Sequence, residues 1–208
     1  SIRRQRQMCI RDSYYVREIF PFGQNCYLRS DMYHQYAPFF SELWHKIRNG
    51  EMLTYSWDIG MGTNFTSLYA YYLASPVNWF IALFPQKYMI EIMNAIIILK
   101  MSAASLTFCY YISKHFNTKK CTIALFGVFY SLCGFLAAYS WNIMWLDCVL
   151  LLPLIMLGLE KLVKENKCFL YCISLGICIY TNYYISIMVC ISVVIYFVVL
   201  LLAYDGVK

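Results

Sequence analysis

The sequence predicts an all-α protein that crosses a membrane several times, a polytopic transmembrane helix bundle. Hydrophobic residues make up 61% of the 208 residues, and only 13% are charged. A soluble domain needs more charge than this to cover its surface, and the mean hydropathy of +0.54 points the same way. Several apolar stretches also reach the length that a membrane-spanning helix needs, so we expect about four or five spans and one substantial loop.

Residues 1–13 are set apart from the rest of the chain. Residues 7–13 resemble the in-frame translation of a sequencing adapter, and no structural period runs through them. We expect this segment to be non-native and give it no part in function. At the other end, residues 205–208 follow directly after an apolar stretch. We therefore expect the chain to be a fragment of a longer protein.

Residues 14–87 mix aromatic and charged side chains, which predicts a loop of amphipathic and re-entrant helices. The first helix is expected to begin at Ser30 or Asp31, since both residue types cap helix N-termini, and to stop at Gly50. Pro38 lacks a backbone donor and should kink or restart it. Helical spacing predicts an apolar face and a polar face. The apolar face holds Tyr33, Tyr36, Ala37, Phe40, Trp44 and Ile47, and the polar face holds Asp31, His34, Gln35, Glu42, His45 and Lys46.

Residues 65–84 are apolar enough to cross a membrane, but Ser75 followed by Pro76 is typical of a helix start. We predict two short helices here, interfacial or re-entrant, instead of one span. If the segment did cross, the Asp31 region would lie on the cytoplasmic side, so the residues alone leave both sides open.

Residues 88–208 predict a bundle of about five spans, at 88–112, 121–139, 143–162 or 148–162, 168–183 and 185–204. The first is roughly 37 Å long at the rise of an α-helix, enough to cross with some tilt. Two loops rich in lysine alternate with loops at 140–147 and 182–186 that hold neither Lys nor Arg. The lysines are Lys114, Lys119 and Lys120, then Lys161, Lys164 and Lys167. This alternation places the lysine loops in the cytoplasm and the other two outside. It also accounts for the formal charge of +6 without a nucleic-acid partner.

Four motifs carry a resemblance to a known family. They are SDMYHQY at residues 30–36, WDIGMG at 57–62, SWNIMWLD at 140–147 and TNYY at 181–184. From about residue 20 onward the chain resembles the amino-terminal part of the YfhO family of bacterial membrane proteins. The resemblance implies a GT-C-type glycosyltransferase that moves a sugar from a polyprenyl-phosphate carrier to an envelope polymer such as lipoteichoic acid. It also implies a multi-pass protein of the bacterial cell membrane, surrounded by the lipid bilayer, with residues 14–87 extracytoplasmic.

Such a transfer needs a carboxylate base and cationic groups for the departing phosphate. Asp31 is the prime candidate for the catalytic base, with Asp58 and Asp147 as runners-up. The alternative for Asp31 is a helix cap that only satisfies backbone amides. Arg29 and His34 are candidate phosphate ligands, for which a solvated loop charge is the alternative.

Lys100 lies near the middle of the first predicted span, where an ionised side chain costs at least roughly 2.5–3.5 kcal/mol. Glu91 is nine residues away, which places it on the opposite side of that helix, so it is not the partner. Lys100 therefore requires either an ion-pair partner on another helix or a bound lipid phosphate.

The remaining substrate-binding candidates lie in the motifs. They are Gln35, Trp141, Asn142, Trp145, Asp147, Asn182 and Tyr183. Interfacial aromatic belts explain the aromatic residues without function, and Asp147 fits equally well as the N-cap of a span. The cysteines mostly lie in apolar segments, where they act as small hydrophobes. No cofactor is indicated with certainty, a divalent cation stays open, and the metal requirement is unknown.

Two other functions remain open at this point. A transporter or flippase of lipid-linked envelope precursors would use Lys100 and Glu91 to line a pathway and Asp31 as a gate residue. A non-catalytic membrane scaffold would need none of these residues. No P-loop, Ser-His-Asp spacing or His-rich metal motif points to an ATP-driven machine or a hydrolase.

Overall fold

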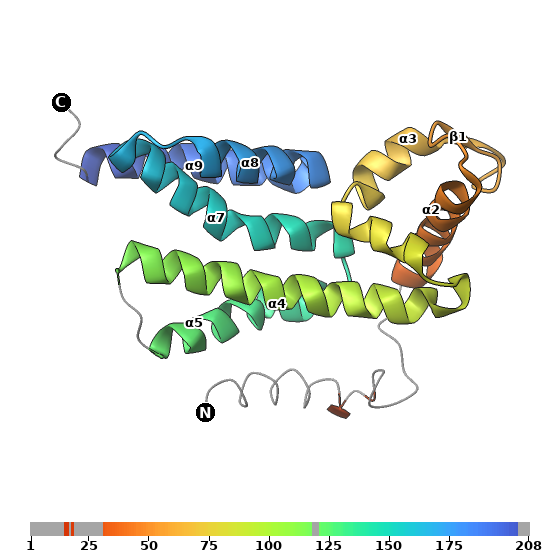
Figure 1. The fold of residues 1–208 in the computed structure, drawn as a ribbon, viewed down its shortest axis with the longest axis horizontal. Helices are drawn as coiled ribbons and strands as arrows, with labels where there is room; N and C mark the ends of the chain where they lie inside the picture. The colour runs from red at the N-terminus through yellow and green to blue at the C-terminus, as the bar shows by residue number, and fades with distance from the viewer. Residues whose placement is uncertain (1–14, 17, 19–30, 118–120, 204–208) are drawn as a thin grey trace. The chain divides into compact units, whose positions relative to one another are not determined.

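A computed structural model describes residues 15–16, 18, 31–117 and 121–203 (Figure 1). Helices make up almost all the regular structure of these residues, and the two strands found there have two residues each. The predicted all-α class is confirmed. The described residues pack as two units. One comprises residues up to Leu99 together with Leu132–Met144, and the other comprises Lys100–Ser131 and the chain from Trp145 onward.

Some predictions fall outside the described residues. They concern residues 1–13, Arg29, Ser30, Lys119, Lys120 and residues 205–208.

The first unit consists of short helices, one hairpin and the first part of a long helix. In chain order these are η1 (Met32–Tyr36), α2 (Ala37–Asn49), β1 (Tyr55–Ser56), β2 (Thr63–Asn64), α3 (Phe65–Leu68), η2 (Tyr69–Leu73), η3 (Pro76–Leu83), η4 (Gln86–Tyr88), α4 (Met89–His115) as far as Leu99, and α6 (Gly134–Tyr139). The strands pair antiparallel, with Tyr55 opposite Asn64.

The boundaries of α2 follow from two residues. Pro38 has no backbone N–H, so the regular i to i−4 ladder cannot run through it. The turn before it, η1, is π-helical, and the Ala37 N–H bonds to the Met32 carbonyl five residues back. At the other end Gly50 adopts φ +67°, and the N–H groups of Gly50 and Glu51 both bond to the Lys46 carbonyl. The predicted restart and stop are both present.

The predicted faces of this helix are wrong in part. Tyr36 and Phe40 are buried as predicted, but Tyr33 is 62% exposed, while Glu42 and Lys46 are buried. Two causes account for this. The π turn inserts an extra residue per turn and so rotates the residues that precede Pro38. In addition, the β1–β2 hairpin folds over the polar side of α2 and covers its charged pair.

Residues 65–84 break where predicted. Helix η2 ends at Leu73, and η3 begins with Pro76 in its first turn and Ser75 at the N-cap position. Ser75 makes no side-chain capping bond, so the proline alone accounts for the restart. The structure therefore has short helical pieces where composition alone would have allowed a continuous span.

The second unit consists of apolar helices. They are α4 from Lys100, α5 (Thr122–Ser131), α7 (Ile143–Glu165) from Trp145, α8 (Phe169–Thr181) and α9 (Tyr183–Ala203). A stripe at three- and four-residue spacing on α7 forms its core with one residue of α8 and three of α9. These residues are Cys148, Leu151, Ile155 and Leu159, with Cys178, Val189, Val193 and Leu200. The outward residues of α9, such as Ile191 and Leu202, are exposed and apolar, as lipid contact requires.

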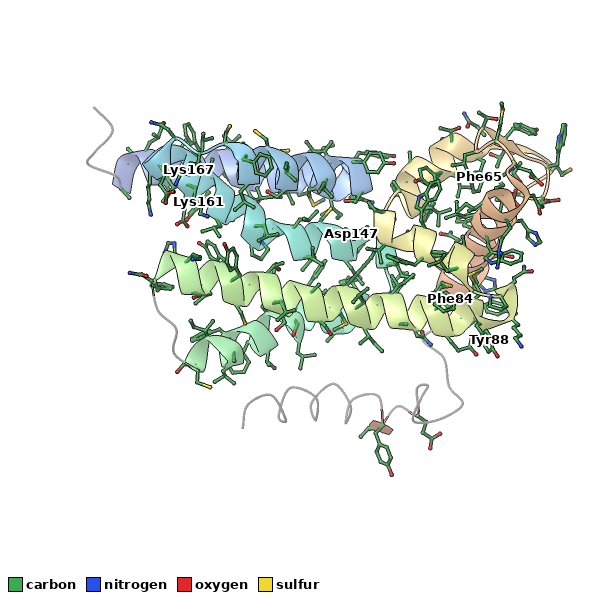
Figure 2. The ribbon with its side chains drawn as sticks, viewed as in Figure 1. Phe65, Phe84, Tyr88, Asp147, Lys161 and Lys167 are labelled. Atoms are coloured by element: carbon green, nitrogen blue, oxygen red, sulfur yellow. The ribbon has the colours of Figure 1, made fainter. Side chains whose placement is uncertain are left out.

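Four described helical stretches are long and apolar enough to cross a membrane. They are Gln86–His115, Thr122–Tyr139, Ile143–Glu165 and Tyr183–Ala203. The remaining predicted span, at residues 168–183, is the 13-residue helix α8, which at about 20 Å is shorter than the hydrocarbon core. Lys161 and Lys167 lie toward the opposite end of α7 from Asp147 (Figure 2), as expected if the lysine-rich loop and the lysine-free loop at 140–147 lie at opposite ends of this helix.

A buried carboxylate joins three helices of the second unit near the lysine end. The Tyr196 hydroxyl donates to Glu160 Oε1 at 2.6 Å, and His115 Nδ1 lies 2.7 Å from the same oxygen. Lys164 Nζ is 3.6 Å from the other oxygen. Glu160 thereby links α4, α7 and α9, and its polar partners reduce the cost of burying its charge.

Gly158 sets the distance between α7 and α8. A Cβ at this position would lie 2.6 Å from the backbone nitrogen and 2.7 Å from the Cα of Tyr171. Gly158→Ala should therefore force the helices apart and cost about 1–3 kcal/mol of unfolding free energy. Gly176→Ala is the matched control, because nothing lies within 4 Å of its Cβ position. Thermal unfolding in lipid nanodiscs would measure both, and equal midpoints for the two variants would contradict the prediction.

Candidate functional site

Asp31 occupies the N-terminal position of the π-helical turn η1 and is exposed. Its side chain makes no capping hydrogen bond with the backbone of that turn. The simplest structural role for an acidic residue at a helix start is to accept such bonds. Asp31 does not play this role in the structure.

His34 and Gln35 lie on the same turn. His34 is exposed, and its ring stands edge-on to Tyr33 at a centroid distance of 5.3 Å. Gln35 Oε1 accepts a hydrogen bond from the Tyr72 hydroxyl at 3.1 Å. Tyr72 belongs to η2, the second π-helical segment, and its ring is also perpendicular to that of Tyr36. The two π-helical turns are therefore held together by Tyr72.

The Tyr36 hydroxyl joins two of the four motifs. It donates to Asn142 Oδ1 at 3.2 Å, and both residues are buried. Burial, followed by the neighbouring Tyr72 and Tyr71 hydroxyls, raises the pKa of Tyr36 above its ordinary value. The charge of Asp31 contributes to the same rise, which places that carboxylate in the electrostatic surroundings of the hydroxyl. Tyr36 thus remains a neutral donor and ties the Asp31 helix to the segment that holds Trp141 and Asn142.

Replacing Tyr36 by Phe should cost about 1–2 kcal/mol of unfolding free energy, because the buried Asn142 oxygen loses its donor. A raised pKa in the folded state stabilises the protein below the unfolded pKa of about 10, and this contribution is lost as the pH rises further. The wild type should therefore lose stability faster than Tyr36→Phe above that pH. Tyr33→Phe is the exposed control. Chemical denaturation at two pH values measures the effect, and parallel pH slopes for the wild type and Tyr36→Phe would refute it.

Trp141 is held by a local contact in the first unit. Its Nε1 donates to the Ala138 carbonyl at 3.0 Å, at the end of α6. The first unit also contains the predicted site residues Asp31, His34, Gln35, Asp58 and Asn142.

Lys100 and Asp147 form an ion pair in the second unit. Lys100 Nζ lies 2.6 Å from Asp147 Oδ2, and the two side chains are 1% and 8% exposed. Asp147 lies within α7, in the fifth position of that helix, and is therefore not its N-cap. The partner on another helix that Lys100 requires is thus present.

The other predicted residues of the second unit are Trp145, Asn182 and Tyr183. Asn182 Oδ1 accepts from the Ile185 N–H at 2.8 Å and so caps the start of α9. Tyr183 is 54% exposed at the first position of that helix. Asn182 therefore has a structural role in the turn between α8 and α9. A sugar that contacts Asn182 would have to leave this capping hydrogen bond in place.

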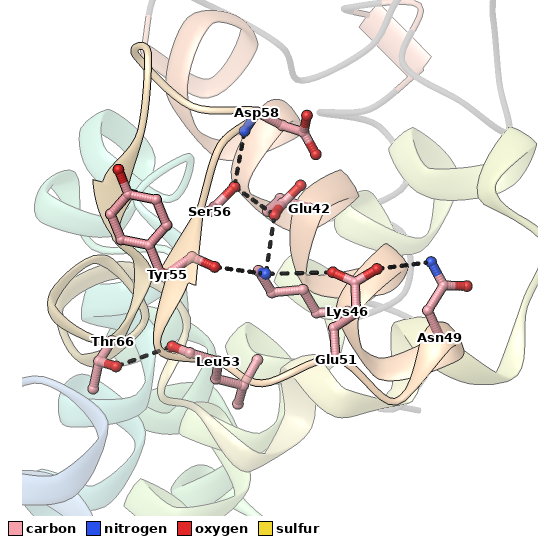
Figure 3. A network of polar contacts seen from close by, with 9 residues as sticks. All are labelled: Glu42, Lys46, Asn49, Glu51, Leu53, Tyr55, Ser56, Asp58 and Thr66. Carbon is pink, nitrogen blue, oxygen red and sulfur yellow. Dashed lines mark hydrogen bonds and ion pairs between the residues drawn. The ribbon is translucent and has the colours of Figure 1, made fainter.

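A polar network under the β1–β2 hairpin was missed at the sequence level (Figure 3). Lys46 Nζ lies 3.5 Å from both Glu42 Oε1 and Glu51 Oε2 and donates to the Tyr55 carbonyl at 2.9 Å. The Ser56 hydroxyl donates to Glu42 at 2.6 Å. The i, i+4 spacing of Glu42 and Lys46 was a visible signal, but such pairs are usually solvated. Here the hairpin buries both residues.

An apolar groove of about 570 Å³ also belongs to the first unit. Its lining is aliphatic or aromatic apart from Glu91. It comes from η3, from Phe84 directly after η3, from η4 and from α4. The residues are Val77, Phe80, Phe84, Tyr88, Glu91, Ile92, Ala95, Ile96 and Leu99. The groove adjoins the stretch Gln86–His115, which is apolar enough to cross a membrane. A hydrocarbon chain is the kind of group that such a surface accommodates.

No group of three or more His, Cys, Asp or Glu side chains that could hold a metal ion occurs among the described residues. The eight cysteines within the described ranges are all free thiols. The described part of the chain thus supplies no ready-made ligand set for a metal.

Comparison with known proteins identifies a family. A family model described as "Bacterial membrane protein YfhO" matches residues 8–208. No curated protein and no solved structure matches the chain significantly.

Proposed function

Because the chain belongs to the YfhO family of bacterial membrane proteins, we propose that it is part of a membrane glycosyltransferase. The donor would be a sugar on a polyprenyl-phosphate carrier, and the acceptor a cell-envelope polymer such as lipoteichoic acid. In this proposal residues 14–87 face the outside of the cell. The alternation of lysine-rich and lysine-free loops supports that orientation.

The observation that carries the proposal is the state of Asp31. Its carboxylate is exposed at the start of η1 and does not cap the helix. The turn that carries Asp31 is hydrogen-bonded to Asn142 through Tyr36, so the position of this turn is fixed. A base that must meet a substrate hydroxyl needs both properties, accessibility and a fixed support.

The proposed reaction exchanges one bond at the anomeric carbon of the sugar. The acceptor hydroxyl oxygen forms a bond to that carbon, and the bond from the carbon to the phosphate oxygen breaks. Asp31 takes the proton of the hydroxyl, and the carrier phosphate leaves with the electron pair. Arg29 and His34 are proposed to stabilise the phosphate charge.

The remaining candidates are proposed to bind the substrates. In the first unit, Gln35 and Asn142 would contact sugar hydroxyls, and Trp141 the sugar or the lipid head group. The candidates of the second unit are proposed separately as substrate-binding residues; they are Lys100, Trp145, Asp147, Asn182 and Tyr183. The apolar groove along η3 and α4 supports a lipid-linked donor, because it offers the carrier chain a place in the same unit as Asp31. A divalent cation remains a proposal without a ligand set among the described residues.

The test is sugar transfer in vesicles that contain the protein, a labelled polyprenyl-phosphate sugar and the acceptor polymer. Labelled polymer with the wild type and its loss with Asp31→Asn, while the carrier still binds, would support the proposal. Movement of the intact lipid-linked sugar across the membrane, lost on replacing Lys100 and without any glycosylated product, would overturn it in favour of a transporter.

A further inference from the structure

The β1–β2 hairpin presents an aromatic pair that the rest of the described chain does not cover. Trp57 is 77% exposed and Tyr55 is 43% exposed. Their ring centroids are 4.9 Å apart at an interplanar angle of 71°. Asp58 follows Trp57 directly and is also exposed. We call these three residues the hairpin platform.

The platform is rigid because the buried network beneath it fixes both ends of β1. Lys46 holds the Tyr55 carbonyl, and Ser56 donates to Glu42. The Asp58 N–H donates to Ser56 Oγ at 3.2 Å, while the Asp58 carboxylate makes none of the contacts drawn in Figure 3. The backbone of Asp58 is therefore held in place, whereas its charged group points to no partner in that network.

The turn of the hairpin is shaped to seat Tyr55. Gly62 adopts φ +109°, and a Cβ there would overlap the Tyr55 hydroxyl. Met61 adopts φ +64°, which is unusual for a residue with a side chain, and it is 96% exposed. The chain thus accepts local strain and leaves a large aromatic surface in water, a combination that is common at binding sites.

The chemistry of the platform argues against three kinds of ligand. A specific protein interface covers roughly 800 Å² per partner, far more than three side chains offer. Anionic lipid surfaces and phosphate polymers attract Lys and Arg, whereas this hairpin carries Asp58 and the half-exposed Glu51. A neutral ligand with an apolar face and many hydroxyl groups fits both the indole and the carboxylate, since C–H groups pack on aromatic faces and hydroxyls donate to carboxylates.

We propose that the hairpin platform binds a neutral hexopyranose residue, with Trp57 against the face of the ring and Asp58 accepting hydrogen bonds from its hydroxyls. As a subsite for the acceptor this rests on the proposed function, and it assigns to the platform a sugar already attached to the polymer. The phosphate groups of such a polymer would lie elsewhere, because Asp58 repels them.

The experiment is saturation-transfer NMR on the full chain in lipid nanodiscs, with methyl hexopyranosides as probes and glycerol 3-phosphate as the anionic comparison. We expect saturable binding of at least one hexoside and none of glycerol 3-phosphate. Trp57→Ala should weaken hexoside binding about tenfold, as loss of one aromatic stacking contact implies, and Trp57→Phe should retain most of it. Asp58→Asn should weaken it several-fold.

Met61→Ala is the matched control, since Met61 is more exposed than Trp57 but lies outside the platform. Its hexoside binding should equal that of the wild type, and circular dichroism verifies the fold of every variant. Absence of hexoside binding, or equal binding by Trp57→Ala and the wild type, overturns the proposal. Because no donor is present, the result is independent of the transfer assay. Binding without transfer would remove the proposed function and keep the platform, and transfer without binding would do the reverse.

Discussion

Replacing Asp31 by Asn should lower the rate of sugar transfer about 10²- to 10⁴-fold, which is the usual contribution of a general base. The change leaves the size of the side chain almost unaltered and removes its ability to take a proton. Binding of the lipid carrier should persist, because Asp31 acts on the acceptor hydroxyl. Transfer of labelled sugar to polymer in vesicles measures the rate, and binding of labelled carrier to the same vesicles measures the affinity.

Asn is chosen because it separates the two roles considered for Asp31. Asn caps helix N-termini as well as Asp does, so a capping role would survive the substitution. Asp31→Glu keeps a carboxylate but moves it by one methylene, and should retain more activity than Asn. Transfer by Asp31→Asn at half the wild-type rate or more would eliminate Asp31 as the base and leave the family resemblance without a catalytic residue.

Much of the architecture could be predicted because it depends on local physics. Pro38, Gly50 and Pro76 each act on the backbone within one turn, so the ends of the helices that they bound follow from the sequence. The long apolar helices follow from composition and length alone. Helix α8 was predicted as a span over residues 168–183, but it has only 13 residues, because Asn182 ends it and caps the start of α9.

The contacts between motifs could not be predicted in the same way. Tyr36 was placed on an apolar face, yet its hydroxyl bonds to Asn142, which lies 106 residues further along the chain. Helical spacing places Glu42 and Lys46 on the polar face of the helix, but a hairpin with only two residues in each strand covers them. Periodicity reports which residues share a side of a helix, and it carries no information about what packs on that side.

The free-energy cost of an ionised side chain in the middle of a span predicts that Lys100 needs a partner, and the helical angle excludes Glu91 as that partner. Nothing in the sequence selected Asp147, which had also been considered as a helix cap. Only the packing of α4 from Lys100 onward with α7 brings the two charges to 2.6 Å.

Removing one partner of this pair should be strongly destabilising. Lys100→Met or Asp147→Leu leaves a single charge buried among apolar helices, and the cost is about 3–5 kcal/mol of unfolding free energy. The double variant has no charge left to bury and should be far more stable than either single variant. Thermal unfolding in nanodiscs measures all three. Alkylation of Cys148, which is buried next to Asp147, reports local opening. Single variants within 1 kcal/mol of the wild type, or fully additive losses, would contradict this.

The double variant also decides between the two roles considered for Lys100. If the pair only holds α4 and α7 together, a well-packed apolar replacement preserves the fold, and sugar transfer should remain near the wild-type rate. If Lys100 also meets the phosphate of the carrier, the double variant should fold normally but bind the carrier weakly, since the cation is gone. The double variant therefore separates the effect on folding from the effect on carrier binding. Neither single variant does so, because each breaks the contact between the helices and leaves a buried charge without its partner.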